Sequence, residues 1–339
     1  MKNSIPKEVL DAYDIGKVVS VKAVKDGLVH KTYDVKTDEG RFIIQNVHQV
    51  LATKGVAADF LAVTRYLHEK GFPTPEAVLS RSEEVLVHNN GNKWRMQTKL
   101  SGQTIHVLKD CSMAYEAGQI YARFHNTLNG MSYKFKAKKL LHETRKIYNK
   151  FLGEIRRPKH TSLLAGVEKE IDFIKSELPK YFLPDDLPLR VIHGDPKISN
   201  VLFDKNGKAK AIIDLDTCNR RPLLVELGDA FRSWCGNAED DPKNKFCLRM
   251  FKSSWGGYEE GIGDLMTKRE KEYLPQSIGT ITLELACRFL TDYFTDNYFG
   301  WDPNKYESRR AHNLARCRGQ IKEFQSFEEK LPKIKKILG

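Results

Sequence analysis

Short runs in which apolar and polar residues alternate fill the first hundred positions of the chain, and many of their apolar members are β-branched. Three runs, at 18–23, 32–36 and 41–45, are separated by turns of the types Asp-Gly and Asp-Glu-Gly. This alternation predicts a three-stranded antiparallel meander. Two more runs, at 84–87 and 94–98, flank an Asn-Asn-Gly-Asn turn and predict a hairpin.

A helical period interrupts these strands. Val56, Phe60, Val63 and Leu67 recur at helical spacing until Gly71, so we expect a helix that starts near residue 54 and stops at this glycine. The first hundred residues are therefore predicted to form a five-stranded sheet with one inserted helix.

The pattern changes after residue 102 and becomes mostly helical. The predicted elements are helices at 112–129, 138–155 and 162–178, a strand at 189–192, a hairpin at 201–214 with an Asn-Gly turn, and helices over most of 226–330. The sequence thus predicts an α+β protein of two lobes. Residues 1–98 form a small β-rich lobe, and residues 99–339 form a larger, mostly helical lobe.

Composition adds little to this plan but excludes several classes of protein. With 40% hydrophobic and 29% charged residues, the chain is typical of globular proteins. Apolar stretches of membrane-spanning length are absent, and the first residues lack the apolar core of a secretory signal. The six cysteines form no Cys-x-x-Cys pair, as expected in a reducing compartment. We expect a cytoplasmic protein without a membrane partner.

The formal net charge of +12 favours an anionic partner. A nucleotide, a nucleic acid and an acidic membrane surface would all satisfy this charge. The basic residues are scattered, however, and no repeat of aromatic and basic residues of the RNA-binding kind is present. We therefore expect no nucleic-acid partner, and the hypothesis of a nucleic-acid-binding protein depends on net charge alone.

Polar groups capable of chemistry are concentrated at 193–200, between a predicted strand and the second hairpin. Because a hairpin brings its two ends together, Asn200 and Asp214 should be neighbours, with Asp195 close by. The oxygens of Asn200 and Asp214 suit Mg²⁺, a hard cation that is bound by few protein ligands. Asp195 is then free to accept a proton from an attacking hydroxyl.

The spacing of His193, Asp195, Asn200 and Asp214 resembles that of the protein-kinase-like superfamily. Within it, the chain is similar to the branch of aminoglycoside phosphotransferases and choline kinases. The resemblance implies a two-lobed kinase-like fold with ATP and Mg²⁺ as cofactors. Asp195 would orient and deprotonate the acceptor hydroxyl, the Asn200 and Asp214 pair would hold Mg²⁺, and Lys197 would offset charge on the transferred phosphoryl group.

The resemblance also implies a nucleotide site between the lobes. Its predicted residues are Val29, His30, Lys31, Ile43, Gln45, Gln97, Lys99 and Leu100. Gln45 falls where kinases carry a lysine that contacts the phosphates. Either Mg²⁺ provides more of the missing charge, or a neighbour such as Lys31 or Arg41 replaces the lysine.

A closer similarity to N-acetylhexosamine 1-kinases extends over most of the chain, through segments such as 27–33, 213–217 and 288–293. It implies a sugar acceptor, with substrate contacts from Asp195, Asp216, Arg288, Asp292 and Tyr298. The expected function is therefore an ATP- and Mg²⁺-dependent sugar kinase acting on the anomeric hydroxyl, as a monomer or homodimer. Open alternatives are an aminoglycoside, choline or homoserine kinase of the same fold, and a nucleotide-binding pseudokinase that regulates a partner.

Overall fold

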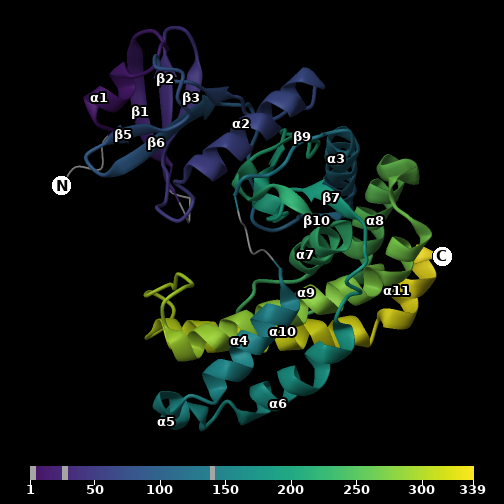
Figure 1. Cartoon of the computed structure of the whole chain (residues 1–339). Helices are drawn as coiled ribbons and strands as arrows, with labels where there is room; N and C mark the ends of the chain where they lie inside the picture. The colour runs from purple at the N-terminus through teal and green to yellow at the C-terminus, as the bar shows by residue number, and fades with distance from the viewer. Residues whose placement is uncertain (1–4, 25–29, 138–141) are drawn as a thin grey trace.

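An antiparallel sheet forms the first lobe of the computed structural model, which describes residues 5–24, 30–137 and 142–339 (Figure 1). The sheet has six strands in the order β1-β2-β3-β6-β4, and β5 pairs with β6. Their bounds are β1 Val18–Val24, β2 Lys31–Thr37, β3 Arg41–Asn46, β4 Ala77–Val78, β5 Val87–Asn89 and β6 Asn92–Thr98. The meander is confirmed. The hairpin is also present, but its first strand is Val87–Asn89 and not 84–87. The predicted count of five was wrong, because two-residue β4 is too short to leave an alternating pattern.

The backbone conformation of the turn between β5 and β6 accounts for the residues found there. Asn90 and Gly91 both have left-handed backbone, with φ of 48° and 76°. A two-residue hairpin turn of this type requires positive φ at both positions, which asparagine and glycine tolerate best. This turn fixes the register of β6 against β5, and β6 is the strand that faces the cleft between the lobes.

The apolar face of this sheet has its own small core. Helix α1, Lys7–Asp11, buries Val9 against Tyr33, Val35 and Ile44 of the sheet. The sequence did not predict α1, because five residues are too few for a helical period. The opposite end of the lobe is closed by α2, Lys54–Glu69, which is capped by Thr53 and followed by left-handed Gly71, as predicted.

Helix α2 packs on the second lobe as well as on its own. Its buried Phe60, Val63 and Leu67 belong to the same apolar core as Phe124 of α3. Thr74, just after α2, donates from Oγ1 to the carbonyl oxygen of Ile212, at 3.0 Å. The two lobes are therefore joined by a shared core behind the cleft.

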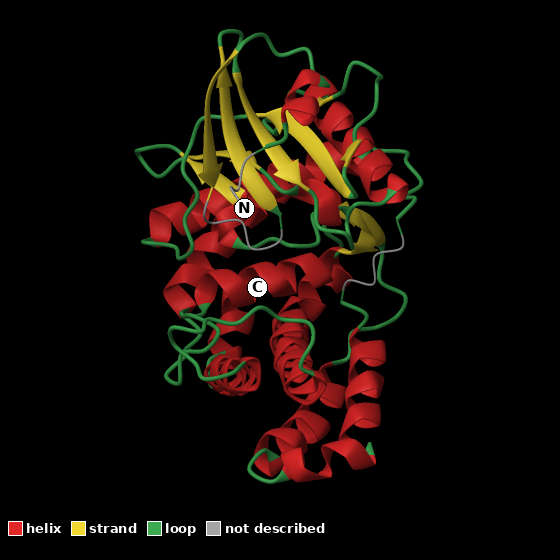
Figure 2. Cartoon of the chain, turned by 90° about the vertical axis from the view of Figure 1, so that its left-hand side faces the viewer, coloured by secondary structure: helices red, strands yellow, loops and turns green. Residues whose placement is uncertain are grey.

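The second lobe is mostly helical (Figure 2). Its elements are α3 Cys111–Asn129, α4 Thr144–Ile155, α5 Thr161–Leu164, α6 Glu168–Glu177, β7 Leu189–Ile192, β8 Val201–Phe203, β9 Ala209–Ile212, β10 Asn219–Pro222, α7 Leu223–Cys235, α8 Leu248–Ile262, α9 Lys268–Thr295, α10 Arg309–Glu328 and α11 Leu331–Leu338. Within residues 5–24, 30–137 and 142–339, no helix combines the length and the apolar character needed to cross a bilayer.

Two predicted helices differ from those observed. The predicted helix at 162–178 is two helices, α5 and α6, because Gly166 between them has a left-handed φ of 89°. Helix α4 begins at Thr144 rather than at 138, and residues 138–141 lie outside the described part. Strand β10, which pairs with β7, was not predicted because its sequence, Asn-Arg-Arg-Pro, has no strand pattern.

Helices α3 and α8 approach each other more closely than side chains would allow. A Cβ atom on Gly118 would lie 2.0 Å from the carbonyl oxygen of Ser254, and one on Gly257 would lie 2.1 Å from that of Tyr115. These glycines therefore set the distance between the two helices, and α3 in turn supports the site loop through its buried Tyr121 and Phe124.

Candidate active site

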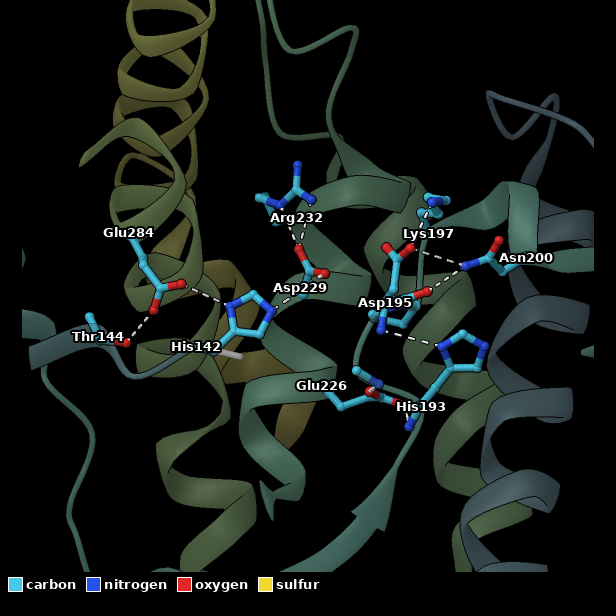
Figure 3. A network of polar contacts seen from close by, with 12 residues as sticks. His142, Thr144, His193, Asp195, Lys197, Asn200, Glu226, Asp229, Arg232 and Glu284 are labelled. Atoms are coloured by element: carbon cyan, nitrogen blue, oxygen red, sulfur yellow. Dashed lines mark hydrogen bonds and ion pairs between the residues drawn. The ribbon is translucent and has the colours of Figure 1, made fainter. Parts of the chain in front are cut away.

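The loop between β7 and β8 gathers the predicted catalytic side chains around Asp195 (Figure 3). Lys197 Nζ lies 2.6 Å from Asp195 Oδ2. Asn200 Nδ2 donates to the backbone oxygen of Asp195 at 2.8 Å and approaches Oδ2 at 3.4 Å. No hydrogen bond from a described residue reaches Asp195 Oδ1, so this oxygen can accept a proton from a bound hydroxyl.

A buried glutamate holds the backbone of this loop. Glu226 of α7 accepts hydrogen bonds from the amides of His193, at 2.9 Å, and Gly194, at 2.7 Å. It also contacts His125 Nε2 at 3.0 Å. Burial raises the pKa of Glu226, but the hydrogen bond and charge of His125 outweigh burial and lower it overall. Glu226 was not predicted; an acid among the apolar residues of 223–230 was its only signal.

His193 uses both ring nitrogens inside the protein. Nδ1 accepts from the amide of Asp195 at 3.3 Å, so Nε2 carries the hydrogen and donates to the carbonyl oxygen of Ile213 at 2.9 Å. The ring is fully buried beside Tyr121 and Phe124. His193 therefore supports the loop and does not act as a base.

The hairpin of β8 and β9 brings Asp214 back to Asn200. The amide of Ile213 donates to the carbonyl oxygen of Asn200 at 2.9 Å, which sets Asp214 beside it. Asp214 has left-handed backbone, with φ 65° and ψ 55°. Within the described ranges, its carboxylate has no hydrogen-bond partner, and the Nδ2 bonds of Asn200 leave that residue's Oδ1 free.

These free oxygens fit a magnesium ion. Burial is the largest cause that raises the pKa of Asp214, and the carboxylate of Asp216, which adds to the concentration of negative charge here, raises it further. A hard cation bound by one carboxylate and one amide oxygen would relieve that concentration. Asn200 and Asp214 therefore offer oxygen ligands of the kind that the predicted Mg²⁺ site needs, and their role as metal ligands stays a prediction.

Lys197 remains protonated in this setting. Burial lowers its pKa, but the charges of Asp195 and Asp214 outweigh burial and raise the pKa overall. Lys197 also lines the cleft, so its ammonium can face a transferred phosphoryl group.

Asp216 points toward the first lobe. Arg95 of β6 donates to both of its carboxylate oxygens, and His30 Nε2 lies 3.0 Å from Oδ2. Burial raises the pKa of Asp216, but the charge of Arg95 and the hydrogen bond of His30 lower it overall. The carboxylate is 1% exposed and used by protein partners, so its predicted contact with substrate has no support in this geometry.

A cleft of about 600 Å³ runs from the hinge between the lobes past Lys197. Six of the predicted nucleotide residues line it: His30, Ile43, Gln45, Gln97, Lys99 and Leu100. Lys31 is exposed and is not in the lining, and Val29 lies outside the described residues. Arg95, which also lines the cleft, was not predicted.

Neither neighbour proposed to replace the missing lysine faces this cleft. Arg41 pairs with Asp34 at 2.6 Å and is not among the lining residues, and Lys31 has just been excluded. Asp59 of α2 is also directed elsewhere, because its carboxylate accepts from the amides of Lys136 and Ala137 at 2.8 and 2.9 Å.

A second group of charged side chains, of both signs, lies beside this loop (Figure 3). Asp229 Oδ1 accepts from Arg232 Nε and Nη2 at 3.0 and 2.7 Å. His142 lies between Glu284, at 2.9 Å, and Asp229, at 4.0 Å. Burial lowers the pKa of His142, but the charge of Glu284 outweighs it and raises the pKa overall. Neither His142 nor Glu284 was predicted, because no pattern in the sequence marks either residue.

The three remaining substrate candidates differ in their surroundings. Arg288 is half-buried, with Cζ 5.5 Å from the ring of Phe299, and has no hydrogen bond or ion pair to any described residue. Asp292 is used by the chain itself, accepting from the amides of 297–299 and from Asn313 Nδ2. Tyr298 is 71% exposed. The predicted substrate contact of Asp292 therefore conflicts with its structural contacts, whereas Arg288 is available.

A family model described as "Phosphotransferase enzyme family" matches residues 20–259 of the chain. Homoserine kinase of Methylobacillus flagellatus is 26% identical over 324 residues, covering 92% of this chain and 93% of that protein. Homoserine kinase of Caulobacter vibrioides is 24% identical over 266 residues, covering 78% and 80%.

Solved structures agree with this fold. An aminoglycoside phosphotransferase from Alicyclobacillus acidocaldarius superposes with a TM-score of 0.64 at 15% identity, covering 98% of both chains. A microcompartment-associated aminopropanol kinase superposes with a TM-score of 0.66 at 17% identity, also covering 98% of both chains. The kinase-like fold expected from the sequence is confirmed.

Proposed function

The chain belongs to the phosphotransferase enzyme family, and from this premise we propose that it transfers the terminal phosphoryl group of ATP to the hydroxyl of a small amino-bearing molecule, with homoserine as the favoured acceptor. The observation that carries the proposal is the position of Asp195. Its Oδ2 is bound by Lys197 and approached by Asn200 Nδ2, whereas its Oδ1 accepts no hydrogen bond from a described residue.

The roles of the side chains follow from this geometry. Asp195 Oδ1 accepts the hydroxyl proton as the acceptor oxygen attacks, and Lys197 keeps Oδ2 fixed while its charge faces the moving phosphoryl group. Asn200 and Asp214 would hold Mg²⁺, which would supply positive charge to the phosphate oxygens. Glu226 keeps the backbone of the loop in place throughout.

The acceptor class is argued from the relatives and from the charges near Asp195. Relatives that cover most of the chain are named homoserine kinases, and a structural neighbour is named an aminopropanol kinase. An amino acid needs a cation for its carboxylate and an anion for its ammonium. The guanidinium of Arg288, which makes no hydrogen bond or ion pair with a described residue, offers the cation. The carboxylate of Asp229, already paired with Arg232, lies within electrostatic reach of it. The earlier preference for an N-acetylhexosamine has no support from these relatives.

A panel of acceptors tests the proposal. The protein is incubated with ATP, Mg²⁺ and either L-homoserine, an amino alcohol, choline, an aminoglycoside or N-acetylglucosamine, and both ADP release and product mass are measured. We expect L-homoserine to give a phosphorylated product and matching ADP.

Other outcomes would indicate a different function. A phosphorylated sugar without phosphorylated homoserine would restore the sugar-kinase hypothesis. Binding of ATP without any product or ADP across the panel would favour the pseudokinase. A protein that binds neither ATP nor ADP would contradict the kinase proposal altogether.

A further inference from the structure

Gln45 of β3 and Arg95 of β6 are partners in the sheet register at the nucleotide end of the cleft. Arg95 Nη2 lies 2.6 Å from Gln45 Oε1. A guanidinium has only hydrogen-bond donors, so the Gln45 atom that faces it must be the oxygen. The side-chain NH₂ group of Gln45 therefore points away from Arg95. No described residue accepts a hydrogen bond from this group, so both of its hydrogens can be donated to a ligand in the cleft that Gln45 lines.

Arg95 itself is held from the other lobe. It is 3% exposed, donates to both oxygens of Asp216, and has its Cζ 4.0 Å from the centre of the Phe60 ring. A bidentate pair of this kind fixes the plane of the guanidinium. The ion pair between Arg95 and Asp216 therefore sets the orientation of the Gln45 amide, and Asp216 lies only two residues after Asp214.

We propose that Arg95, held by Asp216, is a positioning residue that fixes the amide of Gln45 as the hydrogen-bond donor to the nucleotide phosphates, where other kinases use a lysine. This inference rests on the proposed nucleotide binding and deepens it. The phosphates meet a neutral donor here, because the charge of Arg95 is balanced by Asp216. The contacts from Gln45 through Arg95 to Asp216 connect the proposed phosphate contact of the first lobe to the proposed metal-binding loop of the second.

Gln45→Glu is the sharpest test, because it keeps an oxygen that Arg95 can bind and replaces the donor NH₂ group with a negatively charged oxygen. The dissociation constant of ADP, measured by calorimetry with Mg²⁺ present and without any acceptor, should rise about tenfold or more, as expected when a hydrogen bond to a charged group is lost. KM for ATP should rise with it. KM for the acceptor should stay unchanged, and the melting temperature of the free protein should not fall. Arg41→Met is the matched control on β3, and its ADP affinity should equal that of the wild type.

A second set of variants tests Arg95. Removing Arg95 alone would leave Asp216 buried and unbalanced, so we use the double variant Arg95→Met, Asp216→Asn, which removes both charges. Its ADP affinity should fall about as far as that of Gln45→Met. Adding Gln45→Met to the double variant should then cost less than twofold, because the amide is already unpositioned.

Two results would overturn this inference. One is an unchanged ADP affinity in Gln45→Glu, and the other is full multiplication of the Gln45 and Arg95 effects. Both leave the proposed kinase function intact, because the wild type still binds ADP and phosphorylates its acceptor. If the wild type binds no ADP, the proposed function fails first and this inference fails with it.

Discussion

The two oxygens of Asp195 have different surroundings, and that difference defines its chemistry. Oδ2 is held by Lys197 and approached by Asn200 Nδ2, whereas Oδ1 has no hydrogen bond within the described chain. A carboxylate arranged in this way can bind a proton at one atom without losing its position.

Asp195→Asn is expected to lower kcat by about 10²–10⁴, because an amide oxygen is a poor proton acceptor. The dissociation constant of ADP should stay within about twofold of the wild type, since the Asn200 and Asp214 pair is untouched. Coupled ADP-release kinetics and calorimetry measure the two quantities. The control is Asp185→Asn, the same chemical change at an exposed residue, and it should leave both unchanged. Wild-type turnover in Asp195→Asn would remove the proposed base.

Glu323 of α10 is a buried acid that lies behind the lining of the cleft and is not part of it. It accepts from Asn244 Nδ2 and Gln320 Nε2 at 3.0 and 3.1 Å, and it is 1% exposed. Burial raises its pKa to about 8, against the opposing charge of Arg232. The folded protein therefore keeps this proton at neutral pH, whereas the unfolded chain loses it near the ordinary glutamate value of 4.5.

The sign of the pH effect follows directly. Below pH 4.5 both states are protonated, and between 4.5 and 8 only the folded state is, so the free energy of unfolding falls as the pH rises. The fall is at most roughly 1.4 kcal/mol for each pH unit. Glu323→Gln removes this dependence. We expect its melting temperature relative to the wild type to increase steadily between about pH 5 and pH 8. A difference that is constant across this range would contradict the prediction.

At the scale of elements, the contact between α3 and α8 depends on the absence of side chains. Gly257→Ala should lower the free energy of unfolding by about 1–3 kcal/mol or more, because its Cβ would meet the carbonyl oxygen of Tyr115 at 2.1 Å. Gly256→Ala is the matched control in the next position of the same helix. Its Cβ would meet nothing within 4 Å, so it should stabilise the helix by up to about 1 kcal/mol. Urea unfolding distinguishes them, and equal effects of the two substitutions would refute this explanation.

Elements that are determined by residues close together in the sequence were predictable. The 90–91 turn and the end of α2 at Gly71 follow from residues that tolerate left-handed backbone, and the helical period of α3 follows from one apolar face. Strands β4 and β10 were missed because pairing with a distant strand creates them. The break at Gly166 was missed because the sequence does not show whether a glycine within a helical pattern has a positive φ.

The candidate site divides in the same way. The spacing of 193–200 and the hairpin after it were enough to bring Asp195, Asn200 and Asp214 together. Arg95 and Glu226 could not be found, because each acts through a partner more than thirty residues away along the chain. Nothing in a single sequence assigns such pairs, whereas a buried charge in the structure reveals them at once.

At the scale of the whole molecule, the lobes are tied together on both sides of the cleft. His30 and Arg95 reach Asp216 within the cleft, and Asp59 of α2 binds the backbone of 136–137 behind it. The cleft therefore has a geometry that depends on contacts made by both lobes.

Asp59→Asn should weaken the second tie, because an amide NH₂ cannot accept from the backbone amide that Asp59 now binds. We expect the free energy of unfolding to fall by about 1–3 kcal/mol, with KM for ATP raised and KM for the acceptor unchanged. Asp14→Asn, which alters an exposed ion pair with Arg81, is the control and should cost less than about 1 kcal/mol. Equal losses in the two variants would show that Asp59 does not connect the lobes.

The left-handed backbone of Asp214 affects how its contribution should be measured. Alanine in this conformation carries a steric penalty that aspartate and asparagine largely escape. Alanine scanning at this position would therefore combine a distorted chain with a lost ligand and overstate the importance of the carboxylate. Asparagine preserves the local conformation, so its residual turnover is the fair measure of what one negative charge contributes at the proposed Mg²⁺ site.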